Sequence, residues 1–589
     1  MAITFDRWVS DTVPSERFPL YTRANVGEVF PDPVFPFTRS LMLFDGAELG
    51  WRDAWERIGA FDADEFRADE MDTIGVSGGY CYLNASIIRL FGERAPGLSA
   101  QAMDEQFFGA QPGLRPYSEE PGDVRPDLSE KVGGWLGFVL TAADTPDLLV
   151  DRQSTEKLRD ARPDVTAMGD RELVDFARNV MTDGGAFRHL FAQHIHATYA
   201  ASVPVGVLAA VTAAIGRPEL LIPLISGVGD VDSAAPSLVM FDLSRIVRGS
   251  AELTAAFDRA AASHSFTGLA DELAGSDGAD ARTFMTAFAE FLHEFGCRGT
   301  NEWEMARVTW ETTPGLALAA IDRMRLADDA AHPANQHAAL AATRAAAGEE
   351  VRATLQAAGV DDETKQNFEL AYAAAAVWLP ARERTKTNNI RLIHEARVPM
   401  LEFGRRMVKA GHFAEPNDWA FLFAGEFDAF FADPPSMKAA IAERRAQWEE
   451  LAAHEPQFVF DGQPDFPGAW VRRDAIRFDK LASGDTLQGI PGCSGVVEGI
   501  ARVVLDSNDP TALAPGDILV APATDPSWTP LFVPAAAVVV DVGAPLSHAV
   551  IVSRELGIPC VISATGGTQR IPDGARVRVD GNSGLVTVL

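Results

Sequence analysis

The last hundred residues alternate short apolar runs with turns, whereas the middle of the chain has a helical pattern. Runs rich in β-branched residues occupy Val496–Leu505, Ile518–Ala521, Ala537–Val542, Cys560–Ser563, Arg576–Asp580 and Leu585–Leu589. Such runs between turn residues predict strands. From about Ala251 to Leu451, alanine-rich stretches with few Pro or Gly breakers predict helices. The fold class we expect is therefore multidomain α and α/β, with a largely helical region followed by a compact β/α domain.

A segment rich in Pro, Gly and Asp, residues 456–487, separates the two regions. It contains Ser483-Gly484-Asp485, which predicts a hinge. We therefore expect residues 1–455 to form one region, mostly helical from about residue 251. Residues 488–589 are expected to form the C-terminal domain.

One helix of the C-terminal domain is predicted to begin beside a histidine. The apolar run Ala535–Val540 predicts a buried strand, and Gly543 lies in the turn after it. Ser547 then offers an N-cap hydroxyl, apolar residues follow at helical spacing, and Gly557 is placed to end the helix. His548 therefore lies in the first helical turn.

A helix N-terminus favours anions, because its first backbone N–H groups are unpaired and the helix dipole is positive there. The dipole stabilises the neutral imidazole of His548 by about 0.3–1 kcal/mol, which lowers its pKa by less than about one unit. A neutral ring is nucleophilic, and the same N–H groups would hold a phosphoryl group placed on it. Taken alone, the Ser-His pair is more typical of a simple helix cap than of a phosphate carrier.

Composition narrows the classes of partner. The net charge of −32 disfavours nucleic acid and anionic membranes, since both need a basic surface. Four cysteines lie far apart without a CxxC pair, which disfavours a zinc site or a disulfide framework and fits a reducing cytoplasm. The N-terminus does not have the shape of a signal peptide. One uncharged stretch, Ala197–Gly216, approaches membrane length, but its polar residues and Pro204 favour a buried core helix with an irregular start.

Four segments, in order, carry a resemblance to a known domain. They are Gly489–Gly495, Ile518–Pro530, Gly543–Pro559 and Val577–Gly581. They resemble the mobile phosphohistidine domain of the phosphoenolpyruvate-utilising enzymes, among them pyruvate phosphate dikinase, phosphoenolpyruvate synthase, rifampin phosphotransferase and phenylphosphate synthase. The resemblance implies a swivelling domain that carries phosphate on His548, supported by Ser547. Ala544 and Pro545 depart from the pattern at positions where relatives often carry Gly and Met.

Sites that would load this histidine are missing from the sequence. No GxxxxGK[ST] loop occurs, and no segment resembles the ATP-grasp region of the fused dikinases. Because the sequence ends at Leu589, we also expect the phosphoenolpyruvate-binding barrel to be absent. The resemblance then implies a separate ATP-grasp-type subunit that binds ATP and Mg²⁺. We expect this chain itself to hold no permanent cofactor and no metal.

Three earlier segments resemble the acceptor-binding region of rifampin phosphotransferase and of the phenylphosphate synthase large subunit. They are Tyr21–Pro31, Gly296–Arg307 and Arg382–Lys386. Phosphoryl transfer needs positive charge around the moving group. Arg382 and Lys386 are four residues apart and share a face if helical, so both are candidate ligands of the phosphoryl oxygens. A solvated helix face is the alternative.

Other residues of these segments are further candidates for the acceptor site. Arg298 and Arg307 flank Glu302, and this pattern is typical of either a phosphate clamp or a buried ion-pair network. Arg23 and Asn25 are candidates for lining the site.

A base must deprotonate the attacking hydroxyl, and a phenol, with a pKa near 10, needs only a moderate one. His394 is the first candidate, because it lies two helical turns after Lys386. His194, His196 and His293 are the others, although each also fits a packed or surface histidine.

In phenylphosphate synthase and related alkylphenol-phosphorylating systems the ATP-binding domain lies on a separate subunit. The resemblance therefore implies the large subunit of a dikinase-type phenol phosphotransferase. Such an enzyme would act in aromatic-compound degradation, convert a phenol or alkylphenol into an aryl phosphate, and release AMP and phosphate. A rifampin-type antibiotic phosphotransferase with a detached ATP subunit is the main alternative. A phosphocarrier acting on another protein is a third possibility, which the roughly 450 residues before the C-terminal domain disfavour.

Overall fold

The computed structural model describes residues 13–67, 70–108, 114–229, 232, 235–329, 332–465, 467–506, 513–525, 528–543 and 547–589. The chain divides into two compact units. Unit 1 comprises Met1–Ala201, Trp303–Arg307 and Arg384–Ile476, and unit 2 comprises Ser202–Glu302, Val308–Glu383 and Arg477–Leu589. This division differs from the predicted boundaries, because residues 1–455 contribute to both units. Two of the boundaries fall inside the long helices α10 (Ala186–Ala214) and α18 (Asp362–Lys409).

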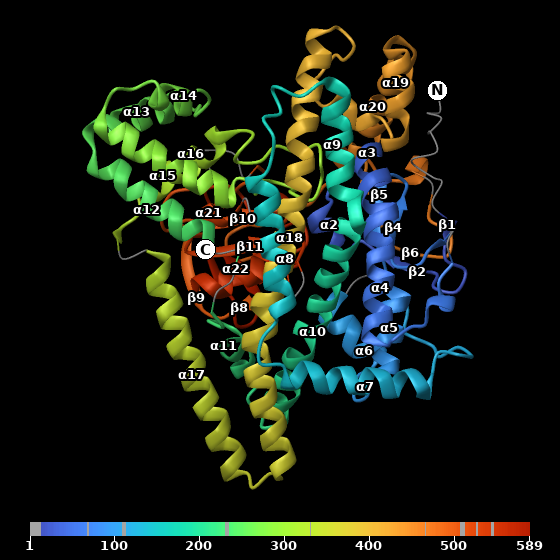
Figure 1. Cartoon of the computed structure of the whole chain (residues 1–589). Helices are drawn as coiled ribbons and strands as arrows, with labels where there is room; N and C mark the ends of the chain where they lie inside the picture. The colour runs from blue at the N-terminus through green and yellow to red at the C-terminus, as the bar shows by residue number, and fades with distance from the viewer. Residues whose placement is uncertain are drawn as a thin grey trace. The chain divides into compact units, whose positions relative to one another are not determined.

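Unit 1 combines helices with two small sheets (Figure 1). Besides the first part of α10 and the second part of α18, its helices are α2 (Val26–Val29), α3 (Pro36–Thr38), the π-helix η1 (Arg39–Glu48), α4 (Leu49–Ile58), α5 (Ala85–Arg94), α6 (Ala100–Met103), the π-helix η3 (Asp104–Phe108), α7 (Pro126–Thr141), α8 (Pro146–Asp160), α9 (Asp170–Thr182), α19 (Phe427–Ala432) and α20 (Lys438–Ala452).

The larger sheet of unit 1 joins distant parts of the sequence. Its strands, in spatial order, are β4 (Ile74–Ser77), β5 (Tyr80–Asn84), β2 (Leu20–Thr22) and β6 (Val459–Asp461), all antiparallel. The pair β1 (Val13–Pro14) and β3 (Glu70–Met71) is parallel. Because β2 pairs with β6, more than four hundred residues separate two neighbouring strands, which explains why the unit is discontinuous.

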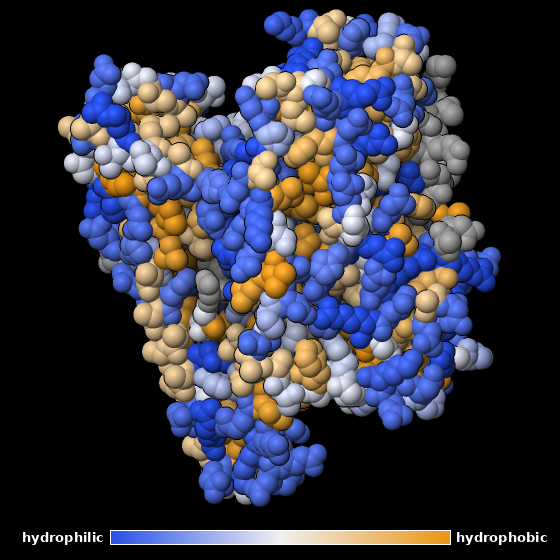
Figure 2. Space-filling view, viewed as in Figure 1, coloured by the Kyte–Doolittle hydropathy of each residue, from blue (hydrophilic) through white to orange (hydrophobic). Residues whose placement is uncertain are grey.

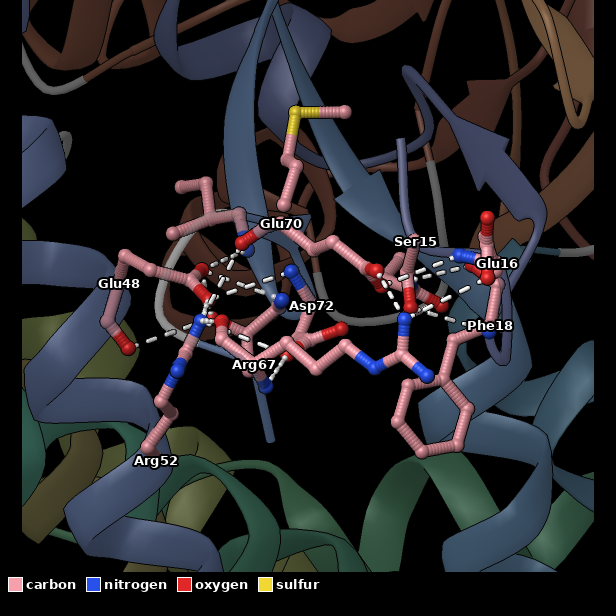
Figure 3. A network of polar contacts seen from close by, with 12 residues as sticks. Ser15, Glu16, Phe18, Glu48, Arg52, Arg67, Glu70 and Asp72 are labelled. Carbon is pink, nitrogen blue, oxygen red and sulfur yellow. Dashed lines mark hydrogen bonds and ion pairs between the residues drawn. The ribbon is translucent and has the colours of Figure 1, made fainter. Parts of the chain in front are cut away.

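A buried carboxylate ties the end of η1 to the chain around β3 and β4 (Figure 3). Glu48 is 6% exposed and accepts hydrogen bonds from Arg52 Nη2 at 2.7 Å and from the backbone N–H of Ile74 at 2.8 Å. The N–H groups of Asp72 and Thr73 donate to the same carboxylate. Burial raises the pKa of Glu48, and the Arg52 charge and these donors oppose that rise. The network is therefore structural, and it fixes the start of the sheet against α4.

One helical stretch, Asp170–Ala214, is long and apolar enough to cross a membrane, but 61% of its most apolar window is buried inside the protein. Burial of this kind is what a core helix shows. The predicted irregular start near residue 197 is wrong: α10 runs from Ala186 to Ala214 with Pro204 inside it.

The helical part of unit 2 confirms the pattern in the middle of the sequence. Besides the second part of α10 and the first part of α18, its helices are α11 (Leu221–Ile225), α12 (Ala235–Gly249), α13 (Ala251–Ala262), α14 (Leu269–Ala274), α15 (Ala279–Phe295), α16 (Pro314–Arg325) and α17 (Pro333–Ala357). Phe284, Phe288 and Phe291 of α15 stack along one helix face and lie in the core of this group. Their spacing of three and four residues is that of a buried helical stripe.

An eight-stranded mixed sheet follows in unit 2. In spatial order its strands are β7 (Thr486–Gln488), β14 (Leu585–Val588), β13 (Arg576–Asp580), β9 (Val496–Val503), β10 (Ile518–Ala521), β11 (Ala537–Val540), β12 (Cys560–Ile562) and β8 (Ile490–Cys493). The central strands β9, β10, β11 and β12 are parallel. All six predicted strands are present, which confirms the expected β/α domain.

Strands β7 and β8 were not predicted. The reason for β8 is its composition, since Pro491 and Gly492 are turn formers. Proline is tolerated in this strand because β8 lies at the edge of the sheet, where it pairs only with β12.

Candidate active site

His548 is the first residue of α22 (His548–Leu556), the helix that connects the parallel strands β11 and β12 (Figure 1). It therefore lies at the carboxyl end of β11, the edge at which open α/β sheets place their ligands. Gly557 ends the helix in the left-handed conformation with φ of 64°, as predicted. Ala544 and Pro545, which depart from the family pattern, lie outside the described residues, as do Pro526 and Ser527.

The ring of His548 lies between two buried threonine hydroxyls. Its Nδ1 is 3.1 Å from Thr524 Oγ1, and its Nε2 is 3.2 Å from Thr529 Oγ1. Thr524 follows β10, and Thr529 begins the short helix α21 (Thr529–Phe532). Phe532 packs edge-on against the ring, with centroids 5.8 Å apart. A hydroxyl can donate to a bare ring nitrogen or accept from a ring N–H, so this pair fixes the plane of the imidazole.

The side chain of Ser547 does not cap α22. Ser547 occupies the N-cap position with extended backbone angles, but its hydroxyl makes no cap hydrogen bond. Within the described part of the chain, its buried Oγ has no hydrogen-bond partner. The expected capping hydroxyl is therefore wrong, while the supporting role of Ser547 toward phosphate stays a prediction. The N–H groups of the first turn are consequently not occupied by this side chain.

Two segments that carried the family resemblance meet in unit 2. The backbone N–H of Asn301 donates to Asp525 Oδ2 at 2.7 Å. Asp525 follows Thr524 directly, and Asn301 belongs to the Gly296–Arg307 segment. The loop after α15 is thus attached to the loop that holds the ring of His548.

Arg298 and Glu302 form a buried ion pair. Arg298 Nε lies 3.1 Å from Glu302 Oε2, and their side chains are 2% and 1% exposed. These contacts match the buried ion-pair network that was the alternative to a phosphate clamp. Arg307 belongs to unit 1, where it pairs with Asp32 and lies over the Trp448 ring. The three residues do not share a common partner among these contacts.

Arg382 and Lys386 both lie on α18, as their spacing predicted. Arg382 pairs with its neighbour Glu383, and its charge acts on Arg554 of α22. Lys386 lies beyond the boundary at residue 383 and belongs to unit 1. Roles of the two cations in holding a phosphoryl group stay predictions.

The C-terminal end of α22 carries two buried charged residues, Arg554 and Glu555, that no sequence motif indicated. Arg554 and Glu555 are each 4% exposed. Burial raises the pKa of Glu555 to about 7, against the opposing effects of the Arg554 charge and of a hydrogen bond from the Gly227 backbone, while Glu383 adds to the rise. Burial also lowers the pKa of Arg554. The hydrogen bond from Gly227 ties α22 to the loop after α11 within unit 2.

Arg23 and Asn25 have structural partners in unit 1. Arg23 is 4% exposed, donates to the backbone oxygens of Cys81 at 2.9 Å and Phe30 at 2.8 Å, and lies over the Tyr80 ring. Asn25 Nδ2 donates to the backbone oxygen of Phe107 at 2.7 Å. These contacts engage both side chains in holding the N-terminal loops, and a role in lining an acceptor site stays a prediction.

The four candidate bases lie in different environments. His394 is fully buried, with Nδ1 3.5 Å from Arg397 Nη1. Trp135 Nε1 donates to His196 Nε2 at 2.9 Å, and burial lowers the pKa of His196 to about 3, which fits a packed neutral ring. His194 Nδ1 lies 3.2 Å from Thr385 Oγ1, and His293 lies in the last turn of α15. None of these contacts joins one of the four to His548.

Comparison with known families identifies two domains. Residues 193–383 match the model of the rifampicin phosphotransferase fourth domain, and residues 513–584 match that of the mobile domain of the PEP-utilising enzymes. The second match contains His548 and both threonines that contact it. The predicted resemblance of the C-terminal domain is thereby confirmed.

Curated relatives agree with these matches. An uncharacterized protein of Mycobacterium tuberculosis is 40% identical over 215 residues, which is 36% of this chain and 24% of that protein. A rifampicin phosphotransferase of Streptomyces sviceus is 30% identical over 324 residues, 54% of this chain and 36% of that enzyme. The prodigiosin synthesizing transferase of Serratia marcescens is 33% identical over 308 residues, 51% of this chain and 33% of that protein. The chain thus spans a quarter to about a third of the length of these relatives.

Proposed function

We propose that this chain, which contains the mobile domain of the PEP-utilising phosphotransferases, carries a phosphoryl group on His548 and transfers it to a hydroxyl of a small molecule. The observation that carries this proposal is the ring of His548, held between Thr524 and Thr529 at the N-terminus of α22. A neutral ring presents one bare nitrogen for attack on phosphorus, and the N–H groups of the first helical turn face the resulting negative charge.

The group would come from ATP bound with Mg²⁺ on an ATP-grasp-type subunit. These 589 residues contain neither a Walker-type loop nor a segment resembling the ATP-grasp region, which supports this part of the proposal. Formation of the phosphorus–nitrogen bond needs the ring nitrogen unprotonated. In the second half-reaction the acceptor oxygen attacks phosphorus, the phosphorus–nitrogen bond breaks, and His548 returns to the neutral ring while a base takes the hydroxyl proton.

We propose a phenol or alkylphenol as the acceptor; over the whole cycle ATP, the phenol and one water would give the aryl phosphate, AMP and phosphate, with the β-phosphoryl group passing through His548. The resemblance of the Arg382–Lys386 and Tyr21–Pro31 segments to the phenylphosphate synthase large subunit supports this choice. The named activity of the Streptomyces relative favours a second candidate, a hydroxyl-bearing antibiotic of the rifampicin type.

Transfer of label from β-³²P-ATP tests the proposal. The native chain and the His548→Ala variant are each incubated with a candidate ATP-grasp partner. Acid-labile label on the native chain only, discharged by phenol or p-cresol, is the expected result. Equal labelling of the variant would remove His548 from the mechanism. Label that rifampicin discharges and p-cresol does not would favour the antibiotic acceptor, and label that only another protein discharges would favour a phosphocarrier.

A further inference from the structure

Unit 1 contains a groove that has the size of a small-molecule site. Its volume is about 570 Å³, within the range of about 300–1,000 Å³ typical of ligand pockets. Residues of α8, α9, α10 and α18 line it, all from segments of unit 1, together with Asp183 from the turn before α10. Figure 2 shows hydrophobic surface between α8 and α9 on the face in view.

Apolar side chains form most of the wall. They are Leu158, Phe176, Val180, Leu190 and Leu392. Leu190 and Leu392 are buried at the base, whereas the other three are only partly covered by the protein. A wall of this kind favours a flat apolar body such as an aromatic ring.

A histidine–aspartate pair lies at the polar end of the groove. Asp151 Oδ1 is 3.0 Å from His189 Nε2. Asp151 is 8% exposed, and its Oδ2 has no hydrogen-bond partner among the described residues, whereas the His189 side chain is 56% exposed. The hydrogen bond to Asp151 raises the pKa of His189; above that pKa the carboxylate accepts from Nε2–H and the neutral ring keeps a lone pair on Nδ1. The pair therefore offers a ligand an oriented hydrogen-bond acceptor.

The charges of the side chains that line the groove favour some classes of ligand over others. The charged or titratable groups that line the groove are Asp151, Asp183 and His189, without a Lys or Arg among the described lining residues. Phosphates and carboxylates are disfavoured there, because no fixed cation compensates the two carboxylates. A neutral molecule with one donor group meets both the apolar wall and the bare Nδ1.

We infer that this groove binds a small aromatic alcohol of the phenol class, with the ring against Phe176 and Val180 and the hydroxyl donating to His189 Nδ1. Asp151 acts as a positioning residue, because it holds the imidazole tautomer. The inference concerns binding alone and does not require phosphoryl transfer from His548.

Titration of p-cresol into the full chain, followed by calorimetry, tests this site. We expect His189→Ala to weaken binding about ten-fold, as for loss of one well-oriented hydrogen bond. The control His332→Ala removes a similar histidine–aspartate pair, with Asp242 at 3.2 Å, that does not line the groove, and it should bind like the native chain. 4-Methylanisole, which lacks the donor, should bind about ten-fold more weakly than p-cresol.

Filling the groove gives a second, independent readout. Val180→Trp and Leu158→Trp should each abolish p-cresol binding. Leu149→Trp, at a 48% exposed position of α8 outside the groove, should leave it unchanged. Thermal unfolding checks that each variant is folded, and His548→Ala should bind normally, so failure of phosphoryl transfer leaves this test unaffected. Unchanged binding in both folded groove variants would overturn the site, and tighter binding of phenethylamine than of p-cresol would overturn the hydroxyl assignment.

Discussion

Glu555 gives the sharpest prediction about stability. Its carboxyl group is 4% exposed and faces Arg554, Glu383 and the backbone of Gly227. Burial raises its pKa from 4.5 to about 7, so the folded state holds the proton more tightly than the unfolded chain does. Stability is therefore lost as the pH rises from about 4.5 to about 7, because folding must then bury a charged carboxylate.

The shift corresponds to a loss of about 3 kcal/mol between the two ends of this pH range. Glu555→Gln keeps the shape of the side chain and an oxygen for the Gly227 N–H, but it cannot ionise. The free energy of unfolding of the variant, relative to that of the native chain, should rise by about 3 kcal/mol between pH 4.5 and pH 8. For a unit of this size that gain is roughly 5 °C in Tm.

Thermal unfolding of both proteins at several pH values measures the effect, with hydrogen exchange of α22 as a local readout. The matched control is Glu498→Gln, an exposed position of β9 in the same unit, where Arg578 lowers the pKa of the carboxyl group. The Tm of Glu498→Gln should differ little from that of the native chain, and at high pH the native chain should be slightly more stable, because its carboxylate is then ionised and paired with Arg578. A Glu555→Gln difference that stays constant from pH 4.5 to pH 8 would refute the assignment of a buried, proton-binding carboxylate.

Three further substitutions have defined outcomes. Thr529→Val removes the hydroxyl at Nε2 of His548, so the initial rate of acid-labile labelling should fall about ten-fold; an unchanged rate would exclude a role in orienting the ring. His196→Phe leaves the Trp135 indole N–H without its acceptor and should cost about 1–3 kcal/mol at pH 8, seen as a lower Tm. The Tm difference should shrink at pH 5, because the unfolded native chain then protonates its histidine while the folded ring, with a pKa of about 3, stays neutral, and the variant has no such penalty. Glu48→Leu removes the nearer of the two carboxylates that pair with the buried Arg52 guanidinium and leaves three backbone N–H groups without their acceptor. It should cost about 3–5 kcal/mol, and a native-like Tm would show that the network in Figure 3 contributes little.

Short-range pattern was sufficient for the elements that carry His548. Strand β10 was predicted with the same bounds that the structure shows, and so was β13, because β-branched runs between turn formers need only their neighbours to be recognised. The end of α22 at Gly557 was likewise local, since a left-handed residue stops a helix wherever it packs. The ordered motifs around these elements were enough to indicate the mobile domain.

Tertiary structure alone decided which side chains meet. The threonines beside His548 lie 19 and 24 residues away from it in sequence, and β2 pairs with a strand more than four hundred residues later. Arg298 and Arg307, nine residues apart in one motif, belong to different units, whereas the Asp151–His189 pair joins two helices that no motif connected. Periodicity reports the face that a segment buries but not the segment that covers it, because burial lowers the free energy whichever apolar partner supplies it. The sequence by itself therefore determined most of the elements and the place of His548 at the start of a helix, and the packing of distant segments decided what surrounds them.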